Sequence, residues 1–179
     1  MIPEIKNSIV AEWVREMAKM CQPDCVVLCD GSEAEKQRLT QEAVSTGELL
    51  ELNHQKLPGC YYHRTAANDV ARTEHLTFIC SRIKEDAGPT NNWMDPHEAY
   101  RKLANIFNGS MKGRTMYIMP FMMGVSSSET TKIGVQLTDS IYVVLNMRIM
   151  TRMGQAALDE LGHTADFTRC LHSKADLDL

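Results

Sequence analysis

The sequence predicts an α/β fold in which helices flank a mixed β-sheet. Strand-like and helix-like segments alternate along the chain, an order that is typical of α/β proteins. The clearest example is the apolar run CVVLC, which is followed by a tight turn, DGS, and then by a helical stretch. The chain has 179 residues, of which 44% are hydrophobic. A chain of this length can bury a core without the help of disulfides or metal ions.

The start of the chain predicts a helix, a strand and a second helix. Apolar residues recur at helical spacing over residues 9–21 and indicate an amphipathic helix. Residues 25–29 then form a short buried strand. Ser32 is followed three residues later by Glu35, which is the spacing of a capping box and predicts the start of the second helix.

The middle of the chain predicts shorter elements. Residues 47–52 favour a helix, whereas residues 60–63 are β-like and residues 76–81 alternate between apolar and polar side chains, as a strand does. Asp95 precedes a proline and therefore predicts the N-cap of a further helix, which ends at Asn108.

The second half of the chain is richer in predicted strands. Residues 115–121, 132–137 and 141–146 are each apolar enough to pair in a sheet. Residues 147–161 then predict a last helix, which Gly162 closes.

Charge and hydropathy argue against several classes of partner. The net charge is −4 and the pI is near 5.9, which disfavours nucleic-acid binding. Two local basic clusters, Lys112 with Arg114 and Arg148 with Arg152, could still bind a small anion. The longest apolar runs are far too short to span a bilayer, and the N-terminus lacks the apolar core of a signal peptide. We therefore expect a cytoplasmic protein with no membrane partner.

The chain contains six cysteines, and three of them are evenly spaced. Cys21, Cys25 and Cys29 lie four residues apart, but this spacing does not match the common iron–sulfur motifs. Cysteine in an apolar run behaves as a small hydrophobic residue. We expect reduced, partly buried thiols and no bound metal.

The strongest polar candidate is Arg72, which Asp69 and Glu74 flank. A lone arginine is most often part of a surface ion pair. Alternatively, its planar guanidinium could bind a carboxylate or a phosphate. No phosphate-binding loop and no histidine pair at metal-ligand spacing accompanies it. The residues by themselves therefore support an α/β domain with one anion-binding arginine.

Seven stretches carry a family resemblance: VVLCDGSEAE, DVARTE, TFICS, EDAGPTNNWMDP, GRTMYIMPFMMG, KIGVQLTDS and YVVLNMRIMTRMG. Together, and in this order, they resemble the N-terminal domain of GTP-dependent phosphoenolpyruvate carboxykinase. The resemblance covers the chain from about Asp30 to His172. It implies the carboxykinase N-terminal type of α/β fold.

The resemblance also implies an activity. In this family a lyase decarboxylates oxaloacetate and uses GTP to form phosphoenolpyruvate, CO2 and GDP in gluconeogenesis. Carried over, Arg72 binds the substrate carboxylate and Glu74 lies near the substrate. Residues 88–93 are a family hallmark, which we expect to be a scaffold that orders the neighbouring cleft. The full enzyme uses GTP and Mn²⁺ or Mg²⁺, and none of these is expected to bind this chain alone.

The sequence also departs from the family pattern. Ala66 and Ala67 stand before DVAR, where the family usually has an acidic residue and a proline. Loss of the proline is expected to loosen that turn. Val125, Glu129 and Ile141 also stand where prolines are common. None of these positions belongs to DVAR, so the departures suggest a divergent member of the family.

The family enzyme is several-fold longer than this chain, and its nucleotide and metal sites lie beyond the region that the resemblance covers. The tail shows no terminating signal. We therefore expect residues 1–179 to form a single substrate-side domain, inactive alone, whose partner is the missing C-terminal part of the enzyme. Two alternatives stay open. One is a stand-alone, non-catalytic module that binds a small carboxylate or phosphate, and the other is a structural or dimerising domain, suggested by the Met-rich stretches.

Overall fold

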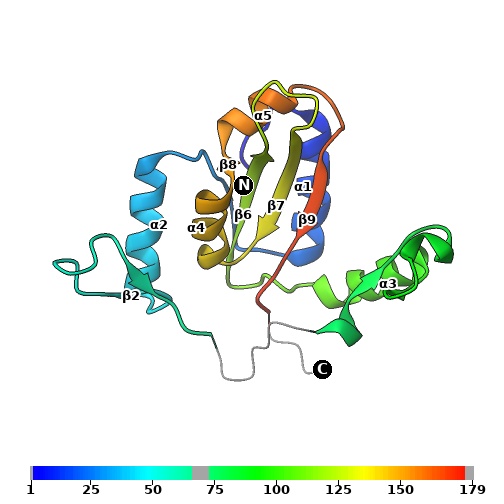
Figure 1. The fold of residues 1–179 in the computed structure, drawn as a ribbon, viewed down its shortest axis with the longest axis horizontal. Helices are drawn as coiled ribbons and strands as arrows, with labels where there is room; N and C mark the ends of the chain where they lie inside the picture. Colours follow the sequence, from blue (N-terminus) through cyan, green and yellow to red (C-terminus); the bar gives the residue numbers. More distant parts are fainter. Residues whose placement is uncertain (1, 66–72, 176–179) are drawn as a thin grey trace. The chain divides into compact units, whose positions relative to one another are not determined.

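The computed structural model describes residues 2–65 and 73–175. The chain divides into two compact units (Figure 1). Unit 1 consists of Met1–His63 and Gly109–Leu179, and unit 2 consists of Arg64–Asn108. We describe each unit by itself.

Unit 1 is built on a mixed sheet, as predicted. Its strands have the order β1-β6-β7-β9, and β8 also pairs with β6. The β1–β6 and β7–β9 pairs are parallel, whereas β6 is antiparallel to β7 and to β8. The bounds of these strands are β1 Cys25–Leu28, β6 Thr115–Met123, β7 Lys132–Thr138, β8 Arg152–Met153 and β9 Thr168–Leu171.

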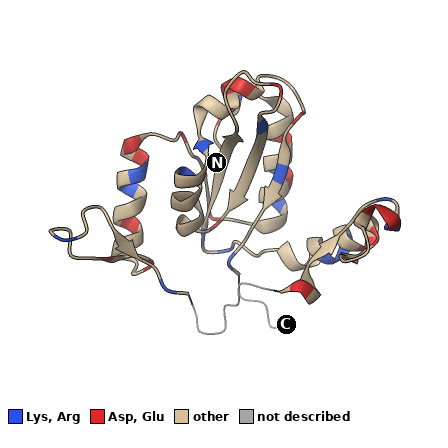
Figure 2. Cartoon of the chain, viewed as in Figure 1, with Lys and Arg blue, Asp and Glu red and all other residues tan. Residues whose placement is uncertain are grey.

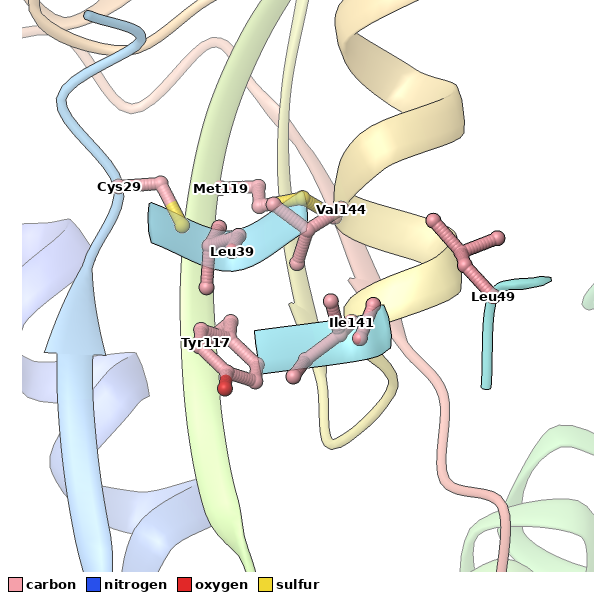
Figure 3. Close-up of a cluster of buried hydrophobic side chains, with 8 residues drawn as sticks. Cys29, Leu39, Leu49, Tyr117, Met119, Ile141 and Val144 are labelled. Atoms are coloured by element: carbon pink, nitrogen blue, oxygen red, sulfur yellow. The ribbon is translucent and has the colours of Figure 1, made fainter. Parts of the chain in front are cut away.

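Two helices cover one face of this sheet. Helix α2 (Glu33–Ser45) contributes Leu39, and helix α4 (Ile141–Met150) contributes Val144 to a buried cluster. The same cluster includes Tyr117 and Met119 of β6 (Figure 3). Burial raises the pKa of the Tyr117 hydroxyl to about 12. This cluster is the core that holds the two helices on the sheet.

Helix α1 (Ser8–Cys21) lies on the other side of the sheet from α4 (Figure 1). Asn7 caps it, because its side-chain oxygen accepts hydrogen bonds from the backbone N–H groups of Ile9 and Val10, both at 3.0 Å. The amide group of Asn7 also donates to the carbonyl oxygens of Gly162 and Thr164, both at 2.9 Å. A single buried side chain therefore fixes both the start of α1 and the end of α5 (Gln155–Leu161).

The turn between β1 and α2 confirms only half of the predicted capping box. The Ser32 hydroxyl accepts a hydrogen bond from the backbone N–H of Glu35 at 3.1 Å. The Glu35 carboxylate, however, accepts from the N–H groups of Asp30 (3.1 Å) and Gly31 (3.0 Å) rather than from that of Ser32. The carboxylate therefore stabilises the whole turn and not just the first position of the helix.

Two glycines allow this turn to contact the segment after β8. A Cβ atom on Gly154 would lie 2.0 Å from the carbonyl oxygen of Asp30, and one on Gly31 would lie 2.4 Å from that of Met153. The φ angle of Gly154 is +90°. Because backbone meets backbone at this point, neither position has room for a larger residue.

The prediction of a strand at residues 141–146 is wrong, since these residues begin helix α4. Ser140 caps this helix, and its hydroxyl accepts from the N–H of Val143 at 3.3 Å. An apolar run of this length is compatible with a buried strand and with a buried helix, so periodicity alone could not separate them. The N-cap residue just before the run was the signal that favoured the helix.

Three other predictions need correction. Residues 147–161 are not one helix, because α4 ends at Met150, β8 follows it and α5 begins only after Gly154; Gly162 does close α5. Residues 47–52 are not helical but contain the short strand β2 (Leu50–Glu51), which pairs with β3 (Tyr61–Tyr62). The tail contains β9, which the sequence did not predict.

A buried carboxylate ties the tail to the sheet. The side chain of Asp139 is fully buried, and it accepts hydrogen bonds from Arg114 Nε at 2.8 Å and from the Ser173 hydroxyl at 2.8 Å. It also accepts from the backbone N–H of Lys174 at 2.9 Å. These bonds hold Ser173 and Lys174, the residues that follow the short edge strand β9, in place.

Unit 2 contains short elements and one helix. They are η1 (Glu74–Leu76), β4 (Phe78–Ile79), η2 (Lys84–Ala87), β5 (Asn92–Trp93) and α3 (Pro96–Phe107). Helix α3 and its cap are confirmed, because the Asp95 carboxylate accepts from the N–H groups of His97 (2.9 Å) and Glu98 (3.1 Å). The strand predicted at residues 76–81 is limited to β4. Among the helices of the described residues, none is both long and apolar enough to cross a bilayer.

Candidate functional site

The residue that the sequence favoured most, Arg72, lies outside the described residues, so the geometry of its guanidinium is not part of the structure. Glu74 is described and begins the 3-10 turn η1 in unit 2, where it is exposed. The candidate site is therefore built from the residues that hold this turn, which starts two positions after Arg72 in the sequence.

One side-chain amide from the family-hallmark loop holds the turn at both ends. The Nδ2 group of Asn92 donates to the carbonyl oxygen of Glu74 at 2.6 Å and to that of Thr77 at 3.2 Å. An amide nitrogen has two N–H donors, so it can satisfy both carbonyls at once. The strand pair β4–β5 places Asn92 beside Phe78, which brings its amide to the turn.

The tryptophan beside it fixes the next stretch of backbone. The indole N–H of Trp93 donates to the carbonyl oxygen of Ser81 at 3.0 Å, and the N–H of Met94 donates to that of Ile79 at 3.2 Å. Trp93 is half-buried. Asn92 and Trp93, which we call the Asn-Trp clamp, therefore hold residues 74–81 from both ends.

The scaffold role predicted for residues 88–93 thus gains a structural basis, although the individual bonds were not foreseen. The sequence offered one signal, since a tryptophan between an asparagine and a methionine is unusual in a polar loop. It did not indicate which carbonyl groups the side chains would reach, because those lie 12 to 18 positions earlier in the chain.

Unit 1 fixes the chain just before it enters unit 2. The ring of His63 stacks on Tyr142 with a centroid separation of 3.9 Å, and its Nδ1 atom lies 2.6 Å from the carbonyl oxygen of Glu48. The Glu48 carboxylate accepts from the N–H of Tyr142 at 3.3 Å, at the start of α4. His63 is thus fixed between a helix terminus and the turn after α2.

In each predicted basic cluster, one arginine is paired with a carboxylate. Arg114 pairs with Asp139, and Arg148 Nη2 lies 2.8 Å from Glu33 Oε1. Helix α2, which carries Glu33, has acidic residues near both ends and basic residues between them (Figure 2). Mixed charge of this kind weakens the case for either cluster as an anion site.

The cysteines behave as predicted where the structure describes them. All six are free thiols, and Cys21 and Cys29 are buried whereas Cys25 is exposed. Burial raises the pKa of the Cys29 thiol far above its ordinary value, which keeps it protonated and unreactive. Within residues 2–65 and 73–175, no three histidine, cysteine or acidic side chains are grouped so as to hold a metal ion.

Unit 1 also contains a cleft. Its volume is about 400 Å³, and its lining includes Ile5, Leu28 and Leu158 together with Lys6 and Asp159. It contains neither Glu74 nor the Asn-Trp clamp. The opposite charges on its rim do not select one ligand, so it does not compete with the candidate site.

The chain combines an α/β unit built on a mixed sheet with a small unit whose sequence includes the DVARTE and NNW stretches. The family model for the phosphoenolpyruvate carboxykinase N-terminal domain matches residues 12–179. The chain therefore belongs to the phosphoenolpyruvate carboxykinase N-terminal domain family.

Curated relatives of the chain carry the name phosphoenolpyruvate carboxykinase [GTP]. The chain is 61% identical over 170 residues to phosphoenolpyruvate carboxykinase [GTP] of Anaeromyxobacter sp. (strain K), and 63% identical to that of Anaeromyxobacter dehalogenans (strain 2CP-C). It is 51% identical over 168 residues to the protein of the same name from Corynebacterium glutamicum (strain ATCC 13032). These matches cover 94–95% of this chain but only 28% of each relative.

Proposed function

We propose that this chain is the substrate-side part of a GTP-dependent phosphoenolpyruvate carboxykinase. The reaction converts oxaloacetate and GTP into phosphoenolpyruvate, CO2 and GDP. The observation that carries the proposal is the identity of 61–63% to carboxykinases over 95% of the chain. The stand-alone binding module is not favoured, because the relatives named above are all carboxykinases.

In this proposal both units belong to one substrate-side domain, which the single family match over residues 12–179 supports. Arg72 holds the substrate carboxylate through two parallel N–H donors, a geometry that lysine cannot reproduce. Its contribution is orientation of the bond that breaks, since fixing a reactant removes much of the entropic barrier. Glu74 lies next to this contact and influences where the substrate sits.

The described residues do not fit the divalent metal that the full enzyme is expected to use. They include no group of metal-ligating side chains, and we derive no step through the metal or the nucleotide. Those sites belong to the part of the enzyme that relatives have and this chain does not span, since the chain covers 28% of their length. We accordingly propose that the chain alone is inactive. A cytoplasmic location stays a prediction.

The same missing part is the proposed partner of unit 2. Unit 2 exposes several large apolar side chains, including Tyr100 (77%), Ile83 (58%) and Leu76 (51%). Covering such side chains with another polypeptide removes apolar surface from water, which is favourable. We propose that the remaining carboxykinase polypeptide packs against this surface when the enzyme is complete.

The test is a kinetic comparison in the full-length polypeptide. Replacing Arg72 with alanine removes a charged contact worth about 1.5–3 kcal/mol, so the KM for oxaloacetate should rise about 10- to 150-fold. Exposed Arg82 in the same unit provides the control, and Arg82→Ala should leave KM unchanged. Equal KM values for Arg72→Ala and the parent, or no phosphoenolpyruvate formed by the parent, would overturn the proposal.

A further inference from the structure

We infer that Asn92 is a positioning residue for the substrate site: its side-chain amide sets the position of the turn that follows Arg72. The inference rests on the proposed function, since it concerns the same site. It assigns a specific task to one side chain of the NNW stretch, for which the sequence suggested only a general scaffold.

The first step of the argument is geometric. Asn92 Nδ2 lies 2.6 Å from the Glu74 carbonyl oxygen and 3.2 Å from that of Thr77. The two carbonyls stand at the beginning and just after the end of η1 (Glu74–Leu76). Two acceptors also fix which end of the amide faces the turn, because the side-chain oxygen of Asn92 would be repelled by both carbonyls.

The second step concerns what else holds the turn. Within it, the N–H of Leu76 donates to Thr73 at 2.9 Å and that of Thr77 donates to Glu74 at 3.2 Å. No residue of η1 is buried, and Leu76 is 51% exposed. Because apolar packing contributes little here, the amide of Asn92 is a large part of what keeps the turn against the rest of unit 2.

The third step connects the turn to the substrate. Glu74, which the proposed function places beside the substrate, is the first residue of η1. A shift of the turn therefore moves the backbone that carries the Glu74 side chain. Catalytic geometry is sensitive to displacements of about 1 Å, even when the altered residue does not touch the substrate.

The neighbouring asparagine provides a matched control. Asn91 Nδ2 donates to the carbonyl oxygen of Ala87 at 2.7 Å, at the end of η2 (Lys84–Ala87). Asn91→Asp and Asn92→Asp each remove one amide donor and add one negative charge in adjacent positions. The two variants differ in which carbonyl groups lose a hydrogen bond, so the difference between their KM values reports on the turn alone.

The experiment measures both substrates' KM values in the full-length polypeptide. Asn92→Asp should raise the KM for oxaloacetate at least about twofold, and by up to about tenfold for each of the two hydrogen bonds that it removes. The KM for GTP should not change, and Asn91→Asp should change neither value. Asn92→Gln keeps the amide donor and should restore part of the loss. A merely structural role would instead alter both KM values together.

A second measurement on this chain checks the geometry without any activity. Amide NMR signals of residues 74–77 should shift in Asn92→Asp and stay in place in Asn91→Asp. Equal effects of the two variants, in either measurement, would overturn the inference. If Arg72→Ala raises the KM for oxaloacetate and Asn92→Asp does not, the inference fails while the proposed function stands. If Arg72→Ala has no effect, the proposed function itself fails.

Discussion

The two units of the chain differ in how they hold themselves together. Unit 1 fully buries large side chains such as Leu39, Met119 and Val144 between its sheet and helices. In unit 2, the buried residues among those described are Ala87 and Ala99, while Tyr100 and Leu103 of its helix are exposed. Unit 1 is therefore stabilised by its own apolar core. Unit 2 is held mainly by hydrogen bonds from side chains to the backbone.

This difference has a functional meaning. A rigid sheet unit can fold and persist without a partner, whereas a unit with little buried surface has low local stability. Elements that move when a ligand binds are drawn from such regions. Glu74 lies in unit 2, so its position depends on polar bonds such as those of the Asn-Trp clamp.

The largest loss of stability is expected at Gly154 of unit 1, where backbone contacts leave no space for a side chain. Gly154→Ala places a Cβ atom 2.0 Å from the Asp30 carbonyl oxygen at a φ of +90°. We expect a loss of about 4 kcal/mol or more in the free energy of unfolding, because backbone must move against backbone. Urea denaturation measures it. Gly47→Ala is the control, since Gly47 has a φ of +77° with no atom within 4 Å, and it should cost about 1–2 kcal/mol. Similar losses for both would show that the contact at Gly154 is not tight.

A pair of leucines tests the comparison directly. Leu39 of α2 is 0% exposed and Leu103 of α3 is 48% exposed. Leu39→Ala should cost about 2–5 kcal/mol because it leaves a cavity in the core. Leu103→Ala should change the free energy of unfolding by less than about 0.5 kcal/mol. A cost above 1.5 kcal/mol for Leu103→Ala, roughly half a core leucine, would mean that unit 2 has a core of its own.

A smaller and more local effect is expected at Trp93. Trp93→Phe keeps an aromatic ring but removes the indole donor to the Ser81 carbonyl, a bond of 3.0 Å. Loss of one such bond costs about 1 kcal/mol. Hydrogen exchange should become faster at residues 79–81, and the amides of the unit 1 sheet should exchange as before. Uniformly faster exchange in both units would contradict the view that this bond supports unit 2 alone.

How far the sequence predicted the fold depended on whether the decisive signal was local. Helix α1 was predicted from the spacing of its apolar residues, and helices α2 and α3 were predicted because their caps, Ser32 and Asp95, lie next to the residues they cap. Helix α4 was mistaken for a strand, since an apolar run is ambiguous without its tertiary surroundings. Strand β9 was missed because its place is fixed by its pairing with β7, in which Gly134 lies opposite Thr168, and no local pattern reveals a partner that distant.

The family was predictable from the sequence, but the geometry of the candidate site was not. Motif resemblance singled out Arg72, Glu74 and residues 88–93 in the correct family. It did not reveal that Asn92 reaches the Glu74 carbonyl, since the partner group is backbone and any residue type supplies it. In a hydrogen bond from a side chain to a distant backbone group, only the residue that supplies the side chain must be of a particular type. The sequence therefore shows only one of the two partners.

The smallest effect tests whether a surface loop of unit 1 is also held by polar bonds. The Glu160 carboxylate accepts from the Ser126 hydroxyl and from the N–H of Ser127, both at 2.7 Å. The Ser126 bond first, and then the Ser127 bond, lower the pKa of Glu160 below its ordinary value of 4.5. A lowered pKa in the folded state means that the bonds stabilise the loop above the unfolded pKa and lose this effect as the pH falls through the folded pKa.

The amide shift of Ser127 should therefore titrate with a midpoint below 4.5. Ser126→Ala should move that midpoint upward, and Glu160→Gln should abolish the titration. A midpoint at or above the ordinary value would show that the carboxylate does not hold this loop.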